Sequence, residues 1–155
     1  MVLRLTEECT LGAVVVQPTW RNLDEAVRGL VHALTEAGYL QATAEAGAVE
    51  AVREREAMAS TELVEINVSI PHARIGGINR VLIALAVSPT GVYEASPQVP
   101  ISIVALMLSP ANVTGAHLNY LSSLSLLLQS APTRARLENA ATAEEVETIV
   151  HAQWR

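Results

Sequence analysis

Two continuous apolar segments, Val81–Val87 and residues 101–108, are rich in Val, Ile and Leu. Turn-forming residues follow each of them, at positions 88–91 and 109–112. A strand with one face in water alternates polar and apolar side chains, whereas a strand covered on both faces is apolar throughout. The two segments therefore predict the central strands of a buried sheet with helices on both faces.

The second segment belongs to a long stretch without charge, because no Asp, Glu, Lys or Arg lies between Glu94 and Arg134. Its apolar part is short, since it runs only over residues 99–108 before Pro110, Asn112 and Thr114 interrupt it. A helix that crosses a bilayer needs about 20 consecutive apolar residues. We therefore expect no membrane insertion.

The start of the chain is unlike a secretory signal. Arg4, Glu7 and Glu8 interrupt the region where a signal peptide has an unbroken apolar stretch. Cys9 is the only cysteine, which excludes an intrachain disulfide, a CxxC redox pair and a multi-cysteine zinc site. We expect a cytoplasmic protein in a reducing compartment.

The composition is that of a folded protein without a polyanion-binding surface. Of the 155 residues, 50% are hydrophobic and 17% are charged, which excludes disorder as the main state. The length predicts a single domain over residues 1–155. The net charge is −6, and the ten basic residues are all arginines. Because they form no basic stripe, we expect no nucleic-acid partner.

Four segments have the residue spacing of amphipathic helices. The first begins after Asn22, with Glu25 completing a capping box, and ends at Gly38. The others cover residues 43–58, residues 115–130 and the segment that follows a capping box at positions 142–145. The residues expected to face the core are Leu23, Ala26, Val27, Leu30, Val31, Leu34, Ala48, Val49, Val52, Ala57, Leu118, Leu121, Leu124, Leu127, Leu128, Val146, Ile149 and Val150.

Two further strands are predicted. Residues 12–17 are apolar and β-branched, and a proline follows them. From Leu63 the period is two: Ile66, Val68 and Ile70 alternate with polar residues, which predicts a half-buried strand with His72 at its exit. Helices before, between and after strands define an α/β fold, here a single domain with a mixed sheet flanked by helices on both faces.

Four histidines are the candidates for chemistry near neutral pH. His32 lies within a helix and His151 near the C-terminal end, where a packed or solvated histidine is the ordinary explanation. His72 differs because Pro71 fixes the backbone in front of it and directs the chain out of the sheet. The pattern leaves two interpretations open: the ring is presented for chemistry, or it caps and packs the end of the strand. His117 stands in the first turn of the third helix.

Four segments of the chain, in this order, resemble one known family: residues 54–61 (EREAMAST), 68–74 (VSIPHAR), 100–110 (PISIVALMLSP) and 117–121 (HLNYL). They are similar to the enzyme IIA domains of the fructose-mannitol class in the bacterial phosphoenolpyruvate-dependent sugar phosphotransferase system (PTS). This class, PTS EIIA type 2, includes a nitrogen-regulatory branch. The resemblance spans nearly the whole chain, and IPHAR is its most specific part.

The resemblance implies a phosphohistidine relay that needs no cofactor and no metal. His72 matches the phosphorylated histidine of the family, Arg55 matches the arginine of its R-E motif, and His117 matches its second active-site histidine. Ser60 and Thr61 match its S-T pair and are further candidates for phosphate binding. The chain would then be a phosphotransferase component.

The chemistry of such a relay needs these residue types. A neutral imidazole attacks a phosphoryl group, and the phosphoramidate that results is labile enough to pass the group on. Because the phosphoryl group brings nearly two negative charges, a guanidinium and N–H donors are needed to hold it. Arg55 and His117 suit these roles, whereas Arg74 either adds charge at the rim or is solvated.

One segment departs from the family's pattern. Family members usually have glycines between the S-T pair and IPHAR, where this chain has residues 63–67 (LVEIN) and one additional residue. Arg55 consequently stands seventeen positions before His72. Val64, Glu65 and Ile66 poorly replace glycine at positive φ, although Asn67 tolerates it. We expect a reshaped loop beside the phosphate.

Three functions follow as hypotheses. The first is a phosphocarrier that accepts a phosphoryl group from the histidine phosphocarrier protein and passes it to a IIB domain or uses it as a signal. The second is a IIA-like module that regulates a target protein. The third, a metal-dependent enzyme using His72 and His117, lacks a close ligand pair such as HExxH. The sugar, the reacting imidazole nitrogen and the presence of a homodimer stay open.

Overall fold

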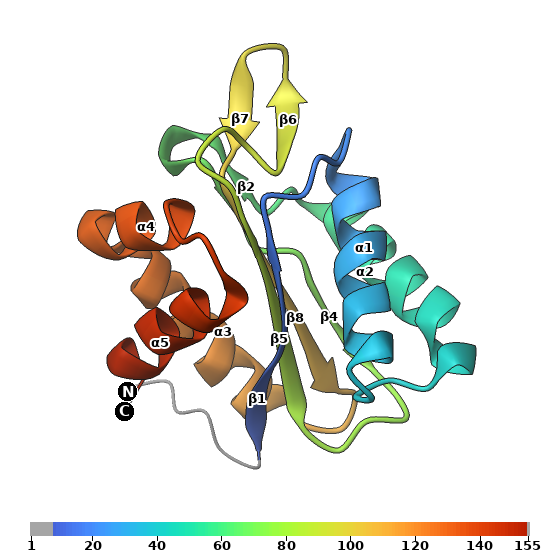
Figure 1. Ribbon diagram of the computed structural model, residues 1–155. Helices are drawn as coiled ribbons and strands as arrows, with labels where there is room; N and C mark the ends of the chain where they lie inside the picture. Colours follow the sequence, from blue (N-terminus) through green and yellow to red (C-terminus); the bar gives the residue numbers. More distant parts are fainter. Residues whose placement is uncertain (1–7, 155) are drawn as a thin grey trace.

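The computed structural model describes residues 8–154, which form a central mixed sheet with two helices on one face and three on the other (Figure 1). The predicted α/β fold is thereby confirmed. Arg4 and Glu7, on which the expectation of a missing signal peptide depends, lie outside the described residues.

The two predicted central strands are observed. β5 (Val81–Val87) and β8 (Ile103–Pro110) are antiparallel neighbours, and β1 (Cys9–Val16) pairs in parallel with β5. Every residue of β5 and β8 is buried. Alternate side chains of these strands belong to two separate apolar clusters, one on each face of the sheet, which explains why β5 and residues 103–108 of β8 are apolar throughout.

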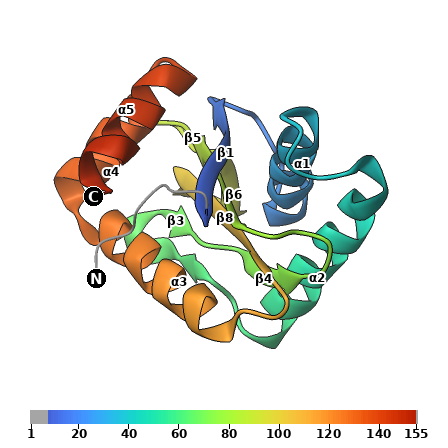
Figure 2. The same ribbon diagram turned by 90° about the horizontal axis from the view of Figure 1, so that it is seen from below.

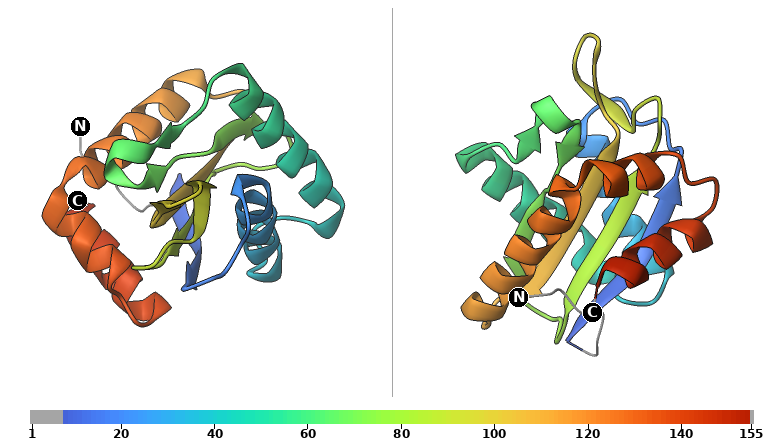
Figure 3. Two further views of the ribbon diagram at one scale, coloured as in Figure 1. Left: turned by 90° about the horizontal axis from the view of Figure 1, so that it is seen from above. Right: turned by 90° about the vertical axis from the view of Figure 1, so that its left-hand side faces the viewer.

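On the other side of β8, two short strands follow one another along the same neighbour. β3 (Val68–Ser69) pairs in parallel with Ile103 and Val104, and β4 (His72–Ile75) pairs in parallel with the segment from Met107 to Pro110. β2 (Glu62–Leu63) is antiparallel to β3. A separate hairpin, β6 (Tyr93–Ser96) and β7 (Val99–Ile101), extends beyond the end of the main sheet (Figure 3).

α1 (Leu23–Glu36) and α2 (Glu45–Met58) cover one face of the sheet, with a short 3₁₀ helix, η1 (Ala42–Ala44), before α2. The predicted capping box is present, because the Glu25 amide donates a hydrogen bond to Asn22 Oδ1 at 2.9 Å. The buried helix residues on this face are Ala26, Val27, Leu30, Val31, Leu34, Ala48 and Val52.

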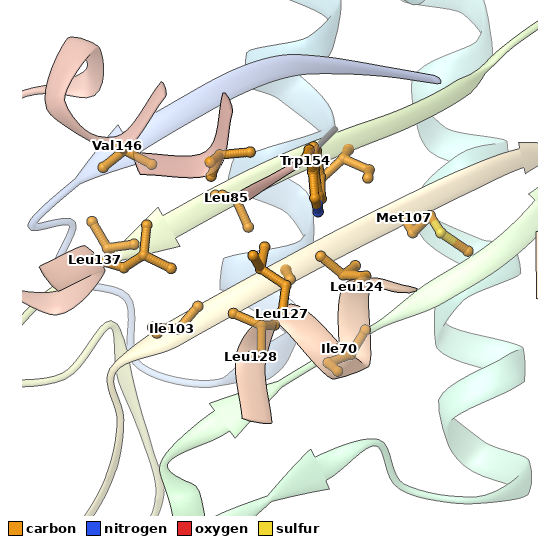
Figure 4. Packing of buried hydrophobic residues seen from close by; sticks show 14 of the residues in the cluster. Ile70, Leu85, Ile103, Met107, Leu124, Leu127, Leu128, Leu137, Val146 and Trp154 are labelled. Carbon is orange, nitrogen blue, oxygen red and sulfur yellow. The ribbon is translucent and has the colours of Figure 1, made fainter. Parts of the chain in front are cut away.

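α3 (Thr114–Gln129), α4 (Ala131–Glu138) and α5 (Ala143–Gln153) cover the other face. Figure 4 shows Leu124, Leu127 and Leu128 of α3 packed over Ile103 and Met107 of β8. Leu137, Val146 and Trp154 complete this cluster. Within residues 8–154 the structure contains no helix that is both long and apolar enough to cross a membrane.

The helix α4 was not among the helices predicted from the sequence. α3 does end at Gln129, but Pro132 lies in the first turn of α4, where a proline is tolerated because its missing N–H has no partner in the helix. Ser130 caps the new helix, with its Oγ accepting from the Thr133 amide at 3.4 Å.

The predicted half-buried strand from Leu63 to Ile70 is wrong. Residues Val64–Ile66 form a 3₁₀ helix, η2, and only two-residue strands flank it. Asn67 has a left-handed φ of 60°, and its side-chain amide donates to the carbonyl oxygen of Pro100 at 2.8 Å. This conformation reverses the chain, which a continuous strand does not allow, and it confirms that Asn67 takes over a glycine-like position.

Two residues expected in the core are exposed. Leu118 of α3 is 59% exposed, and Ala57 near the end of α2 is also exposed. Both fit the helical period, but both lie near an end of their helix: Ala57 is the penultimate residue of α2, and Leu118 is the fifth residue of α3. Leu118 instead lines the pocket described below.

Candidate phosphoryl-binding site

The strand β4 forms one edge of the main sheet, with α2 and α3 on either side of it (Figure 2). Ala73 and Ile75 pack in the cluster beneath α1 and α2. Because side chains alternate along a strand, His72 and Arg74 point to the opposite face, where α3 lies. His72 is the first residue of β4, whereas the sequence pattern placed it at the exit of the preceding strand.

The His72 side chain is held by the backbone just before it. Its Nδ1 lies 2.9 Å from the carbonyl oxygen of Ile70, and because a carbonyl only accepts, Nδ1 carries the proton. Ile70 and Pro71 lie between β3 and β4, outside the residues of either strand that pair with β8, and the Ile70 carbonyl accepts this bond from the His72 ring. The neutral ring thus keeps its lone pair on Nε2.

The environment of His72 favours the neutral ring. The residue is only 6% exposed, and this burial lowers the pKa of the imidazole below its ordinary value. The Arg55 guanidinium lowers the pKa further, whereas the bond to Ile70 and the Glu56 carboxylate act in the opposite direction. A neutral imidazole is the form that acts as a nucleophile.

His117 lies in the first turn of α3 and faces His72. The two ring centroids are 5.6 Å apart and the ring planes are tilted by 44°. Nδ1 of His117 is 2.7 Å from Ser109 Oγ. Burial, followed by the neighbouring His72 and the positive charges of Arg74 and Arg55, lowers the pKa of His117 to about 4. Both imidazoles are therefore neutral at neutral pH.

The two histidines share a pocket of about 720 Å³ with Arg55 of α2 and Arg74 of β4. Arg55 donates to the Ala59 carbonyl at 3.2 Å, and Arg74 donates to Thr114 Oγ1 at 2.7 Å. In the described chain neither guanidinium forms an ion pair, although Glu54 also lines the pocket. His72, His117, Arg55 and Arg74 thus line one pocket.

Ser60 and Thr61 do not line this pocket. Thr61 donates from both its amide and its hydroxyl to the Glu56 carboxylate, at 2.7 and 2.5 Å. Ser60 Oγ accepts from the Glu62 amide at 3.1 Å. These bonds organise the turn that follows α2, so the structure gives both residues a local role and does not bring them to the histidines.

The reshaped loop also lies away from the pocket. None of residues 63–67 is among the lining residues, and the loop contacts the β7 region through Asn67 and Pro100. The residues that stand in place of the family's glycines therefore do not form the walls of the pocket.

Two polar residues of the site were missed by the sequence analysis, Ser109 and Thr114. Ser109 was interpreted as the start of a turn, although it is the penultimate residue of β8 and is fully buried. A signal existed, because Ser109 is a polar residue at the end of an otherwise apolar strand and stands eight positions before His117. Thr114 begins α3, and nothing in its position pointed to Arg74.

The arrangement suits a tetrahedral anion. An unprotonated imidazole nitrogen and two guanidinium groups meet at one opening, and guanidinium groups bind phosphoryl oxygens through directed N–H donors. Among residues 8–154 no group of three or more His, Cys, Asp or Glu side chains is placed to hold a metal ion.

The fold and the paired histidines at the sheet edge together define an α/β domain of the IIA type. The sequence model of the family described as "Phosphoenolpyruvate-dependent sugar phosphotransferase system, EIIA 2" matches residues 9–152. The chain therefore belongs to this family, as the resemblance of its four segments indicated.

Individual relatives agree with this membership. The chain is 27% identical over 150 residues to the PTS system fructose-specific EIIABC component of Bacillus subtilis, covering 96% of this chain and 23% of that protein. It also spans less than two thirds of the length of the other curated relatives it matches.

Solved structures share the fold. The nitrogen regulatory protein IIA-Ntr from Neisseria meningitidis has a TM-score of 0.72 and 27% identity, covering 93% of this chain and 97% of that one. An Escherichia coli structure described as a complex of enzyme IIA mannitol and phosphorylated enzyme IIB mannitol has a TM-score of 0.68 and 19% identity, with coverages of 97% and 99%. The latter similarity concerns the fold alone.

Proposed function

We propose that this chain is a phosphocarrier of the phosphoenolpyruvate-dependent sugar phosphotransferase system that accepts a phosphoryl group on Nε2 of His72. The observation that carries the proposal is the state of His72: its Nδ1 is committed to the Ile70 carbonyl, and its Nε2 is left for reaction in a pocket with two arginines. This choice of nitrogen could not be made from the sequence.

In the proposed step, the lone pair of His72 Nε2 attacks the phosphorus of a phosphohistidine on the donor protein. A P–N bond forms to His72 while the P–N bond to the donor imidazole breaks, and the donor nitrogen leaves with the bonding electrons. The proton on Nδ1 of His72 stays in place. The ring gains positive charge in this step, and the dipole of the Ile70 carbonyl stabilises it.

The remaining residues of the pocket act on the phosphoryl oxygens. Arg55 and Arg74 supply positive charge from two sides, since one lies on α2 and the other on β4. His117 adds a ring nitrogen opposite His72. Because these groups are fixed before the phosphoryl group arrives, they stabilise the transition state without reorganising.

The donor and acceptor are proteins in this proposal. Two large apolar side chains flank the pocket and are exposed, Met58 at 83% and Leu118 at 59%. Exposed apolar groups around a polar opening are typical of protein interaction sites. We propose the histidine phosphocarrier protein as the donor and a IIB domain as the acceptor. The Escherichia coli complex of a IIA with a phosphorylated IIB, on the same fold, supports the second partner.

A regulatory use of the phosphorylated state is the second candidate. The nitrogen regulatory protein of Neisseria meningitidis covers nearly the whole chain at 27% identity, above the 19% of the mannitol protein. In this alternative His72 accepts the phosphoryl group in the same way, but the modified pocket is recognised by a target protein.

The test is incubation of the purified chain with phosphoenolpyruvate, enzyme I and the histidine phosphocarrier protein, followed by intact mass measurement. We expect a mass increase of one phosphoryl group that is lost in acid. His72→Ala should abolish the increase, while His32→Ala, which removes an exposed histidine far from the pocket, should leave it unchanged. A parent protein that is never labelled by an active donor system overturns the phosphocarrier proposal.

A further inference from the structure

A buried serine contacts the second histidine of the pocket. Ser109 is fully buried at the end of β8, directly opposite Arg74 in the pairing of β4 with β8. It stands two residues after Met107, which packs beneath α3, so its side chain points to the same face. Its Oγ lies 2.7 Å from Nδ1 of His117.

The position of the protons in this contact follows from counting donors and acceptors. A hydroxyl has one proton, and a buried hydroxyl is expected to donate it to an acceptor. In the described part of the chain, the contact made by Ser109 Oγ is the one with His117 Nδ1. The hydroxyl therefore donates and Nδ1 accepts, which places the proton of the neutral His117 ring on Nε2.

The two imidazoles then have opposite tautomers. In His72 the Ile70 carbonyl accepts from Nδ1, so Nε2 presents a lone pair. In His117 the Ser109 hydroxyl occupies Nδ1, so Nε2 presents an N–H. With the ring centroids 5.6 Å apart, one ring is prepared as the nucleophile and the other as a hydrogen-bond donor.

We propose that Ser109 is a positioning residue that holds His117 as its Nε2–H tautomer, so that this ring donates a hydrogen bond to the phosphoryl group on His72. The inference rests on the proposed function for the identity of the anion that His117 contacts. The assignment of the His117 tautomer does not depend on the proposed function. The lowered pKa of His117, at about 4, agrees with a donor that acts in its neutral form.

The opposite tautomer would be unfavourable for phosphoryl binding. With the proton on Nδ1, the lone pair of Nε2 would face the negatively charged phosphoryl oxygens and repel them. Without the Ser109 hydroxyl nothing in the contact selects one tautomer over the other. An alanine at position 109 should therefore leave the fold intact and allow both tautomers.

The first test is nitrogen NMR of the imidazoles in the unphosphorylated protein at neutral pH, with resonances assigned by comparison with His117→Gln. In the parent we expect a protonated, pyrrole-type Nε2 and an unprotonated, pyridine-type Nδ1 for His117. Ser109→Ala should show averaged values for both nitrogens. Ser102→Ala, which removes another buried serine that makes no contact with a histidine, should match the parent.

A pyrrole-type Nδ1 in the parent would overturn the inference, as would an unchanged spectrum in Ser109→Ala. The parent spectrum alone decides the tautomer if the variant does not fold. This measurement needs no phosphoryl donor, so it stands even if the chain is never labelled.

The second test is the rate of labelling by the phosphorylated histidine phosphocarrier protein. We expect Ser109→Ala to be slower by roughly tenfold, the lower end of the 10–100-fold loss that follows when a partner orienting a metal-binding histidine is removed. Ser109→Thr, which keeps the hydroxyl, should recover most of the rate and the parent tautomer. Equal rates in the parent and Ser109→Ala, with a proven change of tautomer, would show that the orientation of His117 does not serve transfer.

Discussion

The low pKa of His117 makes the stability of the protein depend on pH in a defined direction. The pKa is about 4 in the folded protein, compared with about 6.5 for an ordinary histidine. Between these two pKa values the imidazole of the unfolded chain is protonated, whereas that of the folded chain is not. The stability due to the neutral ring is complete above pH 6.5 and is lost progressively as the pH falls towards 4.

The size of this effect follows from the two pKa values. One pKa unit corresponds to about 1.4 kcal/mol, so the free energy of unfolding should fall by about 1 kcal/mol at pH 5.5 and by 2–3 kcal/mol at pH 4.5 relative to pH 7.5. The groups that face the ring and act in this direction are His72 and Arg74 on β4 and Arg55 on α2. Burial is the largest cause.

The assay is urea denaturation of the parent and of His117→Gln at several pH values between 7.5 and 4.5. Carboxylates that titrate in this range contribute equally to both proteins, so the difference between the two free energies isolates His117. That difference should decrease towards acid pH by the amounts above. Leu118→Ala, a change in the same helical turn without a titratable group, should keep the pH dependence of the parent. A difference that is constant with pH would refute the argument.

Three further predictions test the site and the fold. Arg55→Gln and Arg74→Gln should each slow phosphoryl acceptance on the order of a hundredfold, as removal of one transition-state donor does. The control Arg53→Gln, which breaks an exposed pair with Asp24, should leave the rate unchanged. The measurement is the rate at which each variant is labelled by the phosphoryl donor. Leu124→Ala should lower the free energy of unfolding by roughly 3 kcal/mol in urea denaturation, because Leu124 of α3 is fully buried in the cluster between this helix and the sheet. Asn67→Val should lower the free energy of unfolding by about 2 kcal/mol, because valine is strained at a φ of 60°. Asn67→Gly should lower it by less, and thermal unfolding of the two variants measures the difference.

Much of the fold was readable from local pattern. The strands β5 and β8 were predicted because burial on both faces makes β5 apolar throughout and leaves Ser109 as the one polar side chain of β8. The helix α1 was predicted because its cap, period and stop agree. The errors lie where the pattern is short. Residues 63–70 alternate as a strand does, but the left-handed Asn67 and its bond to Pro100 impose a turn.

The candidate site was likewise only partly predictable from the sequence. His72, His117 and Arg55 were singled out by a resemblance in residue order, and the structure brings them to one pocket. Ser60 and Thr61 belong to the same motif, yet their hydrogen bonds lead to Glu56 and Glu62. Sequence order alone does not tell which polar side chains of a motif point into a pocket.

The chain's residue order specifies the layers of the fold and the residue types available for chemistry, because hydrophobic periodicity and capping act over a few neighbouring positions. The tertiary structure decides the state of each functional group. Nε2 of His72 is free because the Ile70 carbonyl accepts from Nδ1, and His117 is neutral because it is buried beside two arginines. Proton positions and charges depend on partners up to tens of residues away, such as Arg55 and Arg74 around His117, and only the packing of β4 between α2 and α3 brings these together.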